Sequence, residues 1–345
     1  MLLAIDTRTI ISIMSKNNNT TKMVRQEQHI STTTTIIMAP TRDVHQGSTF
    51  FDGFKFFSEP DPTHGFVHYV DKATAESNKL IQVQHRDDNA IIIKADNHTV
   101  IAPDDDIVGR SSVRIISNEA YDSGLFVFDV YHMPIGCGTW PALWLLGPDW
   151  PHGGEIDIVE GVNRQTRNLM TLHTSTGCMQ RPHAIQRGKT ITDDCDVNAA
   201  DQEQNQGCSV QDRSKRSFGT GFNQHGGGVF AVQWMPMTGI QIWFFERDHI
   251  PRDIKAGSHP DPRTWGTPSA NFPFDQHFCS ATRFRKLNII INTTFCGDWA
   301  GNPKIYHASR CPGDCVEFVR NNPEKFDEAY WRIKNIKVYT ALFFH

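Results

Sequence analysis

The chain has 345 residues, a formal net charge of −4 at pH 7, and 22 Phe, 8 Trp and 6 Tyr residues. A charge this close to neutral gives no electrostatic reason to bind nucleic acid or an anionic membrane surface, so we expect neither as a partner. The aromatic side chains can fill a core and can also stack on the apolar faces of sugar rings. A neutral polymer is therefore the more natural partner, and the length allows one large all-β domain or two ordinary domains.

The segment 1–44 is rich in Thr, Asn, Ser and Ile, with consecutive threonines at 32–35. Low complexity of this kind predicts disorder. Two apolar stretches, residues 2–5 and 10–14, are separated by Asp6 and Arg8, so they make a poor secretory signal. No apolar run approaches the length of a membrane span. Either export uses an unusual leader or the natural chain begins elsewhere.

Short apolar and aromatic segments broken by turn residues begin at about residue 47. No helical periodicity competes with them, and strands at this spacing indicate a two-sheet sandwich or a barrel. We therefore predict one all-β domain over residues 45–341, an antiparallel β-sandwich of the jelly-roll type, followed by a short tail at 342–345. The predicted strands include residues 50–57, 91–94, 112–116, 124–130, 229–234, 239–245, 287–295 and 331–339.

Polar residues and Gly replace the hydrophobic pattern between residues 178 and 228, which predicts a long loop region held by disulfides. Residues 249–277 form a second loop rich in Pro and Asp, and residues 323–330 predict a short helix. In the last predicted strand, alternation places on one face Trp331, Ile333, Asn335, Lys337 and Tyr339. This mixture of apolar and polar residues predicts a strand that is only partly buried.

The eight cysteines, at 137, 178, 195, 208, 279, 296, 311 and 315, predict a secreted protein with disulfides whose pairing the sequence leaves open. Zinc is the competing interpretation, but Cys311 and Cys315 form one ligand pair without a matching second pair. Glycosylation motifs occur at Asn97 and Asn292, and the apolar run around Asn292 predicts that its motif is buried and unused.

The stretch Gly-Gly-Glu-Ile-Asp-Ile-Val-Glu at residues 153–160 places Glu155, Asp157 and Glu160 among β-branched residues that favour a strand. In a regular strand, Glu155 and Asp157 point to one face and Glu160 points to the other. A β-bulge between Asp157 and Glu160 would add one unpaired residue and return Glu160 to the first face. We expect such a bulge, with all three acids on one surface.

Three carboxylates on one face raise one another's pKa and favour a retained or shared proton. This arrangement suits a glycosidase, which needs one ionised carboxylate as nucleophile and one protonated carboxyl as acid. The alternative is a half-exposed strand with a solvated acidic face, and the flanking sequence has to decide between the two.

The flanks match a known family. With the Glu-x-Asp-x-x-Glu core, the chain resembles the fungal laminarinase-type endo-β-1,3(4)-glucanases of glycoside hydrolase family 16 over nearly all of residues 47–339. The resemblance rests on residues 132–144, 150–155, 161–163, 170–174, 195–198, 242–245, 265–268, 288–301 and 329–331. It implies the same jelly-roll fold, with one curved sheet forming an open substrate cleft.

The resemblance also implies roles for the three acids. Glu155 would be the nucleophile and Glu160 the acid and then the base, while Asp157 would assist by orienting Glu155 and holding the proton on Glu160. Glutamates about 5–5.5 Å apart would retain the anomeric configuration, and about 6.5–9.5 Å would invert it.

Further residues would contact substrate by resemblance: His173 of the Met-Thr-Leu-His motif, the tryptophans Trp144, Trp150 and Trp299, and Arg114. Each also has a structural interpretation, as a buried histidine, a core aromatic or a surface ion pair. Trp140 is interpreted as a core residue. The chain departs from the family at Gln233, where relatives carry Glu, so a contact in the cleft could differ.

We therefore expect a secreted, monomeric endo-glycosidase that hydrolyses internal linkages of β-1,3- and mixed β-1,3/1,4-glucans by double displacement. A β-glucan transglycosylase and a non-catalytic β-glucan-binding protein on the same scaffold are the alternatives. No cofactor is expected, because Gly136 and Gly138 lack the third glycine and the helix of a dinucleotide site. No metal ligand set is readable.

Overall fold

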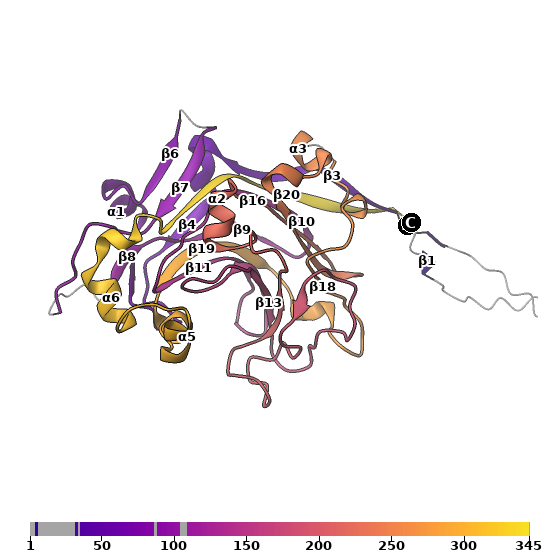
Figure 1. Cartoon of the computed structure of the whole chain (residues 1–345). Coiled ribbons are helices and arrows are strands. Elements are labelled where there is room, and N and C mark those ends of the chain that lie inside the picture. Colours follow the sequence, from indigo (N-terminus) through magenta and orange to yellow (C-terminus); the bar gives the residue numbers. More distant parts are fainter. Residues whose placement is uncertain are drawn as a thin grey trace, which may run out of the picture.

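The computed structural model describes residues 4–5, 32–33 and 35–344, without 86–87, 104–108 and 258. The framework of this part of the chain is a pair of antiparallel eight-stranded sheets that face each other (Figure 1). We call them sheet 1 and sheet 2. The segment 1–34, which includes the poor secretory signal, lies outside the described residues apart from 4–5 and 32–33. Among the described residues, no helix has the length and apolar character that crossing a membrane requires.

Sheet 1 places the last strand of the chain near its centre. In spatial order its strands are β18 (Ala270–Phe272), β17 (Gly239–Glu246), β16 (Gly228–Met235), β10 (Gly124–His132), β20 (Tyr330–Phe344), β7 (Ala90–Lys94) and β6 (Ile81–Gln84), with β3 (Thr35–Gln46) also paired with β20.

Sheet 2 carries the acidic motif on its fourth strand. Its order is β14 (Lys189–Thr190), β15 (Cys208–Gln211), β13 (Leu169–His173), β12 (Glu155–Glu160), β11 (Thr139–Leu146), β19 (Leu287–Phe295), β9 (Arg114–Tyr121) and β4 (Phe54–Phe57). Two further pairs are antiparallel β1 (Ala4–Ile5) with β2 (Thr32–Thr33), and parallel β5 (Val67–Tyr69) with β8 (Arg110–Ser112).

Helices are short, and α5 and α6 lie together at one end of the sandwich (Figure 1). The α-helices are α1 (Lys72–Ser77), α2 (Gly219–Gln224), α3 (Arg252–Ala256), α4 (Gly297–Ala300), α5 (Pro303–Ala308) and α6 (Cys315–Asn321). The 3-10 helices are η1 (Gly47–Gly53), η2 (Arg247–His249), η3 (Pro262–Thr264), η4 (Ala281–Arg283) and η5 (Pro323–Phe326), the last within the segment for which a short helix was predicted.

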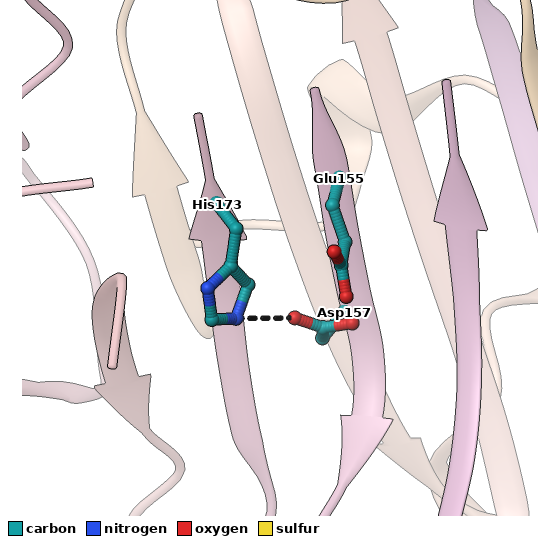
Figure 2. A group of neighbouring side chains, drawn as sticks. All are labelled: Glu155, Asp157 and His173. Atoms are coloured by element: carbon teal, nitrogen blue, oxygen red, sulfur yellow. Dashed lines mark ion pairs between the residues drawn. The ribbon is translucent and has the colours of Figure 1, made fainter. Parts of the chain in front are cut away.

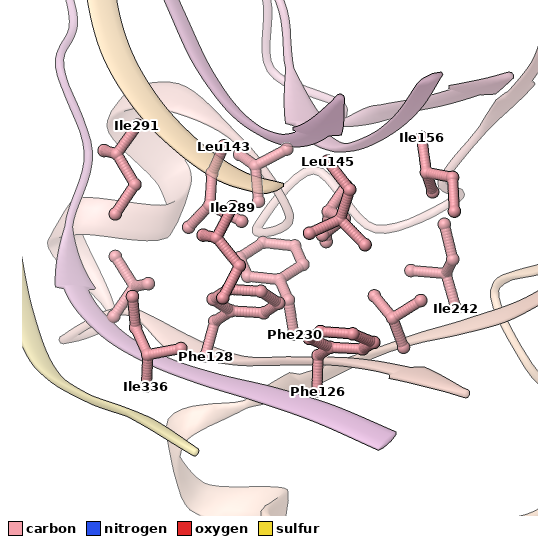
Figure 3. Close-up of a cluster of buried hydrophobic side chains, with 14 of the residues drawn as sticks. Phe126, Phe128, Leu143, Leu145, Ile156, Phe230, Ile242, Ile289, Ile291 and Ile336 are labelled. Atoms are coloured by element: carbon pink, nitrogen blue, oxygen red, sulfur yellow. The ribbon is translucent and has the colours of Figure 1, made fainter. Parts of the chain in front are cut away.

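The main hydrophobic core fills the space between the sheets (Figure 3). Sheet 1 contributes alternate residues such as Phe126, Phe128 and Phe230, and sheet 2 contributes Leu143 and Ile289. Because side chains alternate along a strand, the residues between these point to the outer faces of the two sheets. The outer face of sheet 2 is the one that carries the acidic motif, and we call it the site face. The predicted two-sheet jelly-roll sandwich is confirmed, with open edges.

Two expectations about sheet 1 differ from the structure. Residues 35–44 were expected to be disordered, and the tail was expected to begin at 342, yet β3 pairs with β20 as far as Phe344. The threonine-rich composition of the segment predicted disorder in place of this strand, although Thr favours strands. The expectation that the last strand is only partly buried is wrong. A register shift between Ile333 and Asn335 interrupts the alternation of side chains between the two faces of the strand. Ile336 therefore points into the core, as Ile333 does.

The cysteines form four disulfides, Cys137–Cys311, Cys178–Cys279, Cys195–Cys208 and Cys296–Cys315. Cys311 and Cys315, the pair weighed as zinc ligands, are bonded to two different partners. Cys178–Cys279 and Cys195–Cys208 hold the long loop that was predicted between residues 178 and 228. The other two tie the segment around α5 and α6 to sheet 2.

Candidate active site

Strand β12 contains the bulge that the motif predicted. Its pairing with β13 shifts register between Asp157 and Glu160, and its pairing with β11 shifts at the same place. Ile158 and Val159 therefore both point into the core, where each is fully buried. The extra residue returns Glu160 to the site face, together with Glu155 and Asp157.

Asn168 stabilises this bulge from the neighbouring chain segment. Its side-chain oxygen accepts a hydrogen bond from the Glu160 backbone N–H at 3.0 Å, and its amide nitrogen donates to the Ile158 carbonyl at 2.7 Å. Because of the bulge, these backbone groups have no partner in the regular hydrogen bonding between the strands. A buried backbone group without a hydrogen-bond partner destabilises the folded state. Asn168 is completely buried. Sequence reasoning missed it, because a single Asn before an apolar strand carries no motif.

His173 lies beside the acids, on the neighbouring strand β13. It is the cross-strand neighbour of Glu155, and its Nε2 lies 3.1 Å from Oδ2 of Asp157 (Figure 2). Both side chains are buried, with exposures of 7% for His173 and 1% for Asp157. Figure 2 shows the carboxyl groups of Glu155 and Asp157 turned toward each other on the same strand.

Burial dominates the electrostatics of the three acids. Desolvation, followed by repulsion from Asp157, raises the pKa of Glu155 to about 8. Desolvation also raises the pKa of Glu160 to about 7, and desolvation with repulsion from Glu160 raises the pKa of Asp157 well above its usual value. The group therefore retains protons at neutral pH, and its titration belongs to all three acids together.

Two indole N–H groups reach the two glutamates. Trp150, which is 43% exposed, donates to Oε2 of Glu155. Trp140 donates to Oε1 of Glu160 at 2.9 Å and meets Trp299 edge to face, with ring centroids 5.5 Å apart. The interpretation of Trp140 as a core residue is therefore wrong. Because Leu143 and Leu145 of the same strand point into the core and side chains alternate along it, Trp140 lies on the site face rather than between the sheets.

Arg114 and Trp144 form a second group on the site face. The Arg114 guanidinium lies 4.5 Å from the ring centre of Phe57 and 5.1 Å from that of Trp144, and the side chain is buried. Arg114 thus stacks on aromatic rings rather than forming a surface ion pair. Trp144 donates its indole N–H to Asn292 Oδ1 at 2.8 Å, and Asn292 donates to the Tyr69 hydroxyl at 3.0 Å. The prediction that the Asn292 motif is buried is confirmed.

Two glycines allow the close contacts around the acids. A Cβ on Gly153 would lie 2.1 Å from the Pro148 carbonyl, so only glycine lets the loop that carries Trp150 fold back to Glu155. Gly207 has φ of +62°, and a Cβ there would lie 2.8 Å from the ring of His173. The loop closed by Cys195–Cys208 can therefore pack directly against His173.

A metal ion has one set of candidate ligands among the described residues: Glu155, Asp157 and His173, whose ligand atoms lie within 4.8 Å of one another. Glu155 already accepts the Trp150 indole N–H. The raised pKa values of the acids mean that a metal would have to displace protons as well. This donor set fits proton transfer better than metal binding.

Gln233, where a changed cleft contact was expected, lies elsewhere. It belongs to β16 of sheet 1, and its neighbours Val232 and Trp234 point into the core, so Gln233 points to the outer face of sheet 1. The expectation that this departure alters the site is wrong. A cavity of about 810 Å³ is lined by residues such as Arg187, Asp212 and Glu246, and none of the three acids is among its lining residues.

The fold and these residues define a class of protein. A two-sheet sandwich that presents two proton-binding glutamates and several tryptophans on one open sheet face is suited to cleaving sugar polymers. The catalytic-domain model of the XgeA-like group in glycoside hydrolase family 16 matches residues 54–339. The chain therefore belongs to glycoside hydrolase family 16.

Named relatives agree with this membership. The chain is 44% identical to an endo-1,3(4)-β-glucanase of Arthroderma benhamiae, over 86% of this chain and 64% of that protein. Among solved structures it is similar to laminarinase 16A of Phanerochaete chrysosporium with two β-glucans bound in donor and acceptor sites, with a TM-score of 0.83, 43% identity, and coverage of 89% of this chain and 100% of the other. It is also similar to an elongating β-1,3-glucosyltransferase of family 16, with a TM-score of 0.80, 40% identity, and coverage of 87% and 99%. The chain spans about two thirds or less of the length of the curated relatives that it matches.

Proposed function

We propose that the protein is a retaining endo-glycosidase that cleaves internal linkages of β-1,3- and mixed β-1,3/1,4-glucans. The observation that carries this proposal is the bulge in β12, which puts Glu155 and Glu160 on one open face while their pKa values are raised to about 8 and about 7. Such a pair can supply one ionised and one protonated carboxyl near neutral pH. The relatives named for endo-1,3(4)-β-glucanase and laminarinase activity support the substrate class.

The reaction proceeds in two displacements. In the first, Glu155 attacks the anomeric carbon, the bond from that carbon to the bridging oxygen breaks, and Glu160 gives its proton to that oxygen. In the second, Glu160 takes a proton from water as the water oxygen attacks the same carbon and releases Glu155. Two inversions leave the β configuration unchanged. Asp157 lies between the glutamates on the strand and 3.1 Å from His173, where its carboxyl group, turned toward Glu155 (Figure 2), can orient the nucleophile.

The resting proton distribution differs from the reactive one. In the free site, burial holds the pKa of Glu155 above that of Glu160, although the nucleophile must be ionised and the acid protonated. The positive charge that develops at the anomeric carbon during attack favours ionised Glu155. We therefore expect the proton to rest on Glu160 in the substrate complex, and the free enzyme to titrate as one coupled group.

Transglycosylation is the second candidate, because the similar glucosyltransferase shows that a family 16 chain with 40% identity can pass a glycosyl group to a sugar acceptor. In that reaction a sugar hydroxyl replaces water in the second displacement. We also propose secretion, since four disulfides persist in oxidising compartments, and a monomeric state. A protein that only binds β-glucan would have no use for two half-buried glutamates that retain protons.

The test measures reducing ends released from laminarin, lichenan and xyloglucan by the wild type, Glu155→Gln and Glu160→Gln. We expect the wild type to act on laminarin and lichenan, and each variant to lose activity by about 10³-fold or more. NMR during the first turnovers should show the β-anomer, and chain lengthening in concentrated oligosaccharide would identify transglycosylation. A wild type no more active than Glu155→Gln would overturn the enzyme assignment, and an α-anomer would overturn retention.

A further inference from the structure

Trp140 and Trp150 both donate to a glutamate, but they differ in how firmly they are held. Trp150 is 43% exposed on a loop, so substrate can move it away from Glu155. Trp140 is half-buried within β11, where its backbone pairs with Thr294 of β19, and its ring packs edge to face against Trp299. Its indole N–H therefore stays in place at Oε1 of Glu160.

A fixed N–H donor restricts where Glu160 can carry its proton. An indole nitrogen only donates, so the oxygen that faces it must accept and cannot hold a proton pointing at the same position. The proton of a neutral Glu160 is thereby directed to Oε2. A carboxyl that donates from one defined oxygen has its proton ready at a single position beside the bridging oxygen.

We propose that Trp140 is a positioning residue for Glu160: its indole N–H assigns the acidic proton to Oε2 and stabilises the carboxylate that forms when the proton leaves. The proposal rests on the proposed function, since it presumes that Glu160 protonates the leaving oxygen. As the proton moves from Oε2 to that oxygen, the electron pair of the breaking C–O bond stays on the sugar oxygen and Glu160 gains its negative charge. A hydrogen bond to a charged acceptor is stronger than one to a neutral acceptor, so the Trp140 contact strengthens along the reaction.

The test compares Trp140→Phe, which keeps an aromatic ring and removes the N–H, with the wild type on two substrates. Laminarin has a poor leaving group that needs protonation, whereas a 2,4-dinitrophenyl glycoside of a β-1,3-linked glucobiose has a leaving group that does not. We expect kcat/KM for laminarin to fall about 10-fold or more, as part of the contribution of an acid catalyst. The value for the dinitrophenyl substrate should change less than about twofold. A general loss of structure would lower both values together.

The pH profile supplies a second readout. A donor that stabilises the ionised form lowers the pKa of its acceptor, and Trp140 acts on Glu160 in this direction. Its removal should move the basic limb of kcat for laminarin to higher pH, because kcat reports the substrate complex, in which Glu160 holds the proton. An unchanged limb together with an unchanged substrate ratio would overturn the proposal, whereas a wild type inactive on laminarin would overturn the proposed function instead.

Trp243→Phe is a matched control. Trp243 also donates its indole N–H, to the Gly266 carbonyl at 3.0 Å, and also meets a tryptophan edge to face, with its centroid 5.4 Å from that of Trp265. It lies on the outer face of sheet 1, away from the acids. We expect a similar loss of stability but no change in the substrate ratio or the basic limb.

A measurement on the wild type covers the case in which Trp140→Phe does not fold. In free protein labelled with ¹⁵N at the indole nitrogens, the Trp140 N–H resonance should shift with pH around the raised Glu160 pKa of about 7. The shift should vanish in Glu160→Gln. An indole resonance that does not follow the titration of Glu160 would overturn the proposal.

Discussion

Strands β12 and β20 each contain a register shift, and the two shifts have different consequences. In β12 the extra residue keeps Ile158 and Val159 both in the core and puts three acids on the site face. In β20 the shift between Ile333 and Asn335 keeps Ile336 in the same core as Ile333 and leaves no acid on a sheet face. Both bulges preserve the burial of apolar residues, but only the one in β12 also brings reactive side chains together on one face.

The polar support of the two bulges differs as well. Asn168 pairs with both freed backbone groups of β12 and is completely buried. Near the β20 bulge, Lys334 is 40% exposed and faces Asp88 at 3.7 Å on the surface. A bulge that positions reacting groups has a buried side-chain partner, whereas one that only redistributes apolar residues does not need it. The comparison yields three further predictions.

Deleting Ile158 should have the largest effect. The deletion makes β12 a regular strand in which Val159 still faces the core and Glu160 still faces the acids, but with shifted spacing. A misplacement of about 1 Å can cost 100-fold in rate, so we expect laminarin activity to fall about 100-fold. It should remain above that of Glu160→Gln, whose loss can reach about 10⁴-fold. Deleting Lys334, which removes the extra residue of β20 opposite a matching shift in β10, should leave kcat nearly unchanged.

The deletion assay needs a stability measurement, because loss of a buried isoleucine side chain costs about 2–5 kcal/mol. Rates should therefore be measured well below the midpoint of thermal unfolding of each variant. If the variant without Ile158 folds but is as inactive as Glu160→Gln, the bulge does more than determine the face on which Glu160 lies.

Glu155→Gln should stabilise the protein at neutral and alkaline pH. The pKa of Glu155 is raised from 4.5 to about 8 in the folded state, so the folded state binds more protons than the unfolded state between these values, and stability is lost as the pH rises through them. The variant lacks this loss. We expect its advantage in the free energy of unfolding to grow from pH 4.5 to roughly 4 kcal/mol at pH 8, measured by urea unfolding.

The control for this prediction is Glu324→Gln, which removes a glutamate whose side chain is 60% exposed. Its effect should be small and flat across the same pH range. An advantage of Glu155→Gln that does not depend on pH would contradict the buried, proton-retaining state of the three acids.

Asn168→Ala should destabilise the protein by about 2 kcal/mol, because the Glu160 N–H and the Ile158 carbonyl would be left buried and unpaired. Laminarin activity should fall with it, since the position of Glu160 depends on the bulge. Lys334→Ala, at the other bulge, should change the free energy of unfolding by less than about 0.5 kcal/mol. Equal effects of the two substitutions would remove the distinction between the bulges.

The sequence predicted the β12 bulge because chemistry constrained it: three acids useful only on one face require an extra residue at a known place. It could not predict the β20 bulge, because Ile333, Asn335 and Ile336 are compatible with either register. That choice depends on β10, β7 and β3, which lie far away in the sequence. Trp140 was misassigned for a similar reason, since a tryptophan suits a core and a sugar-facing sheet equally well.

Local signals explain the remaining differences. Helices α5 and α6 have side-chain caps at Asn302 and Asp314, but six- and seven-residue segments are too short for a helical period to emerge. The disulfide pairing joins cysteines up to 174 residues apart, so it follows from the packing of the sheets and not from spacing. Asn168 forms hydrogen bonds with backbone atoms, and the need of a backbone group for a hydrogen-bond partner cannot be read from a pattern of residue types.

The position of β20 has a consequence for biosynthesis. The strand lies between β10 on one side and β7 and β3 on the other, and all three are translated before it. Until β20 leaves the ribosome, the edges at which these three strands pair with it are open. Sheet 1 therefore cannot be completed before β20 is made, and a chaperone that shields those edges during elongation would raise the yield of folded enzyme.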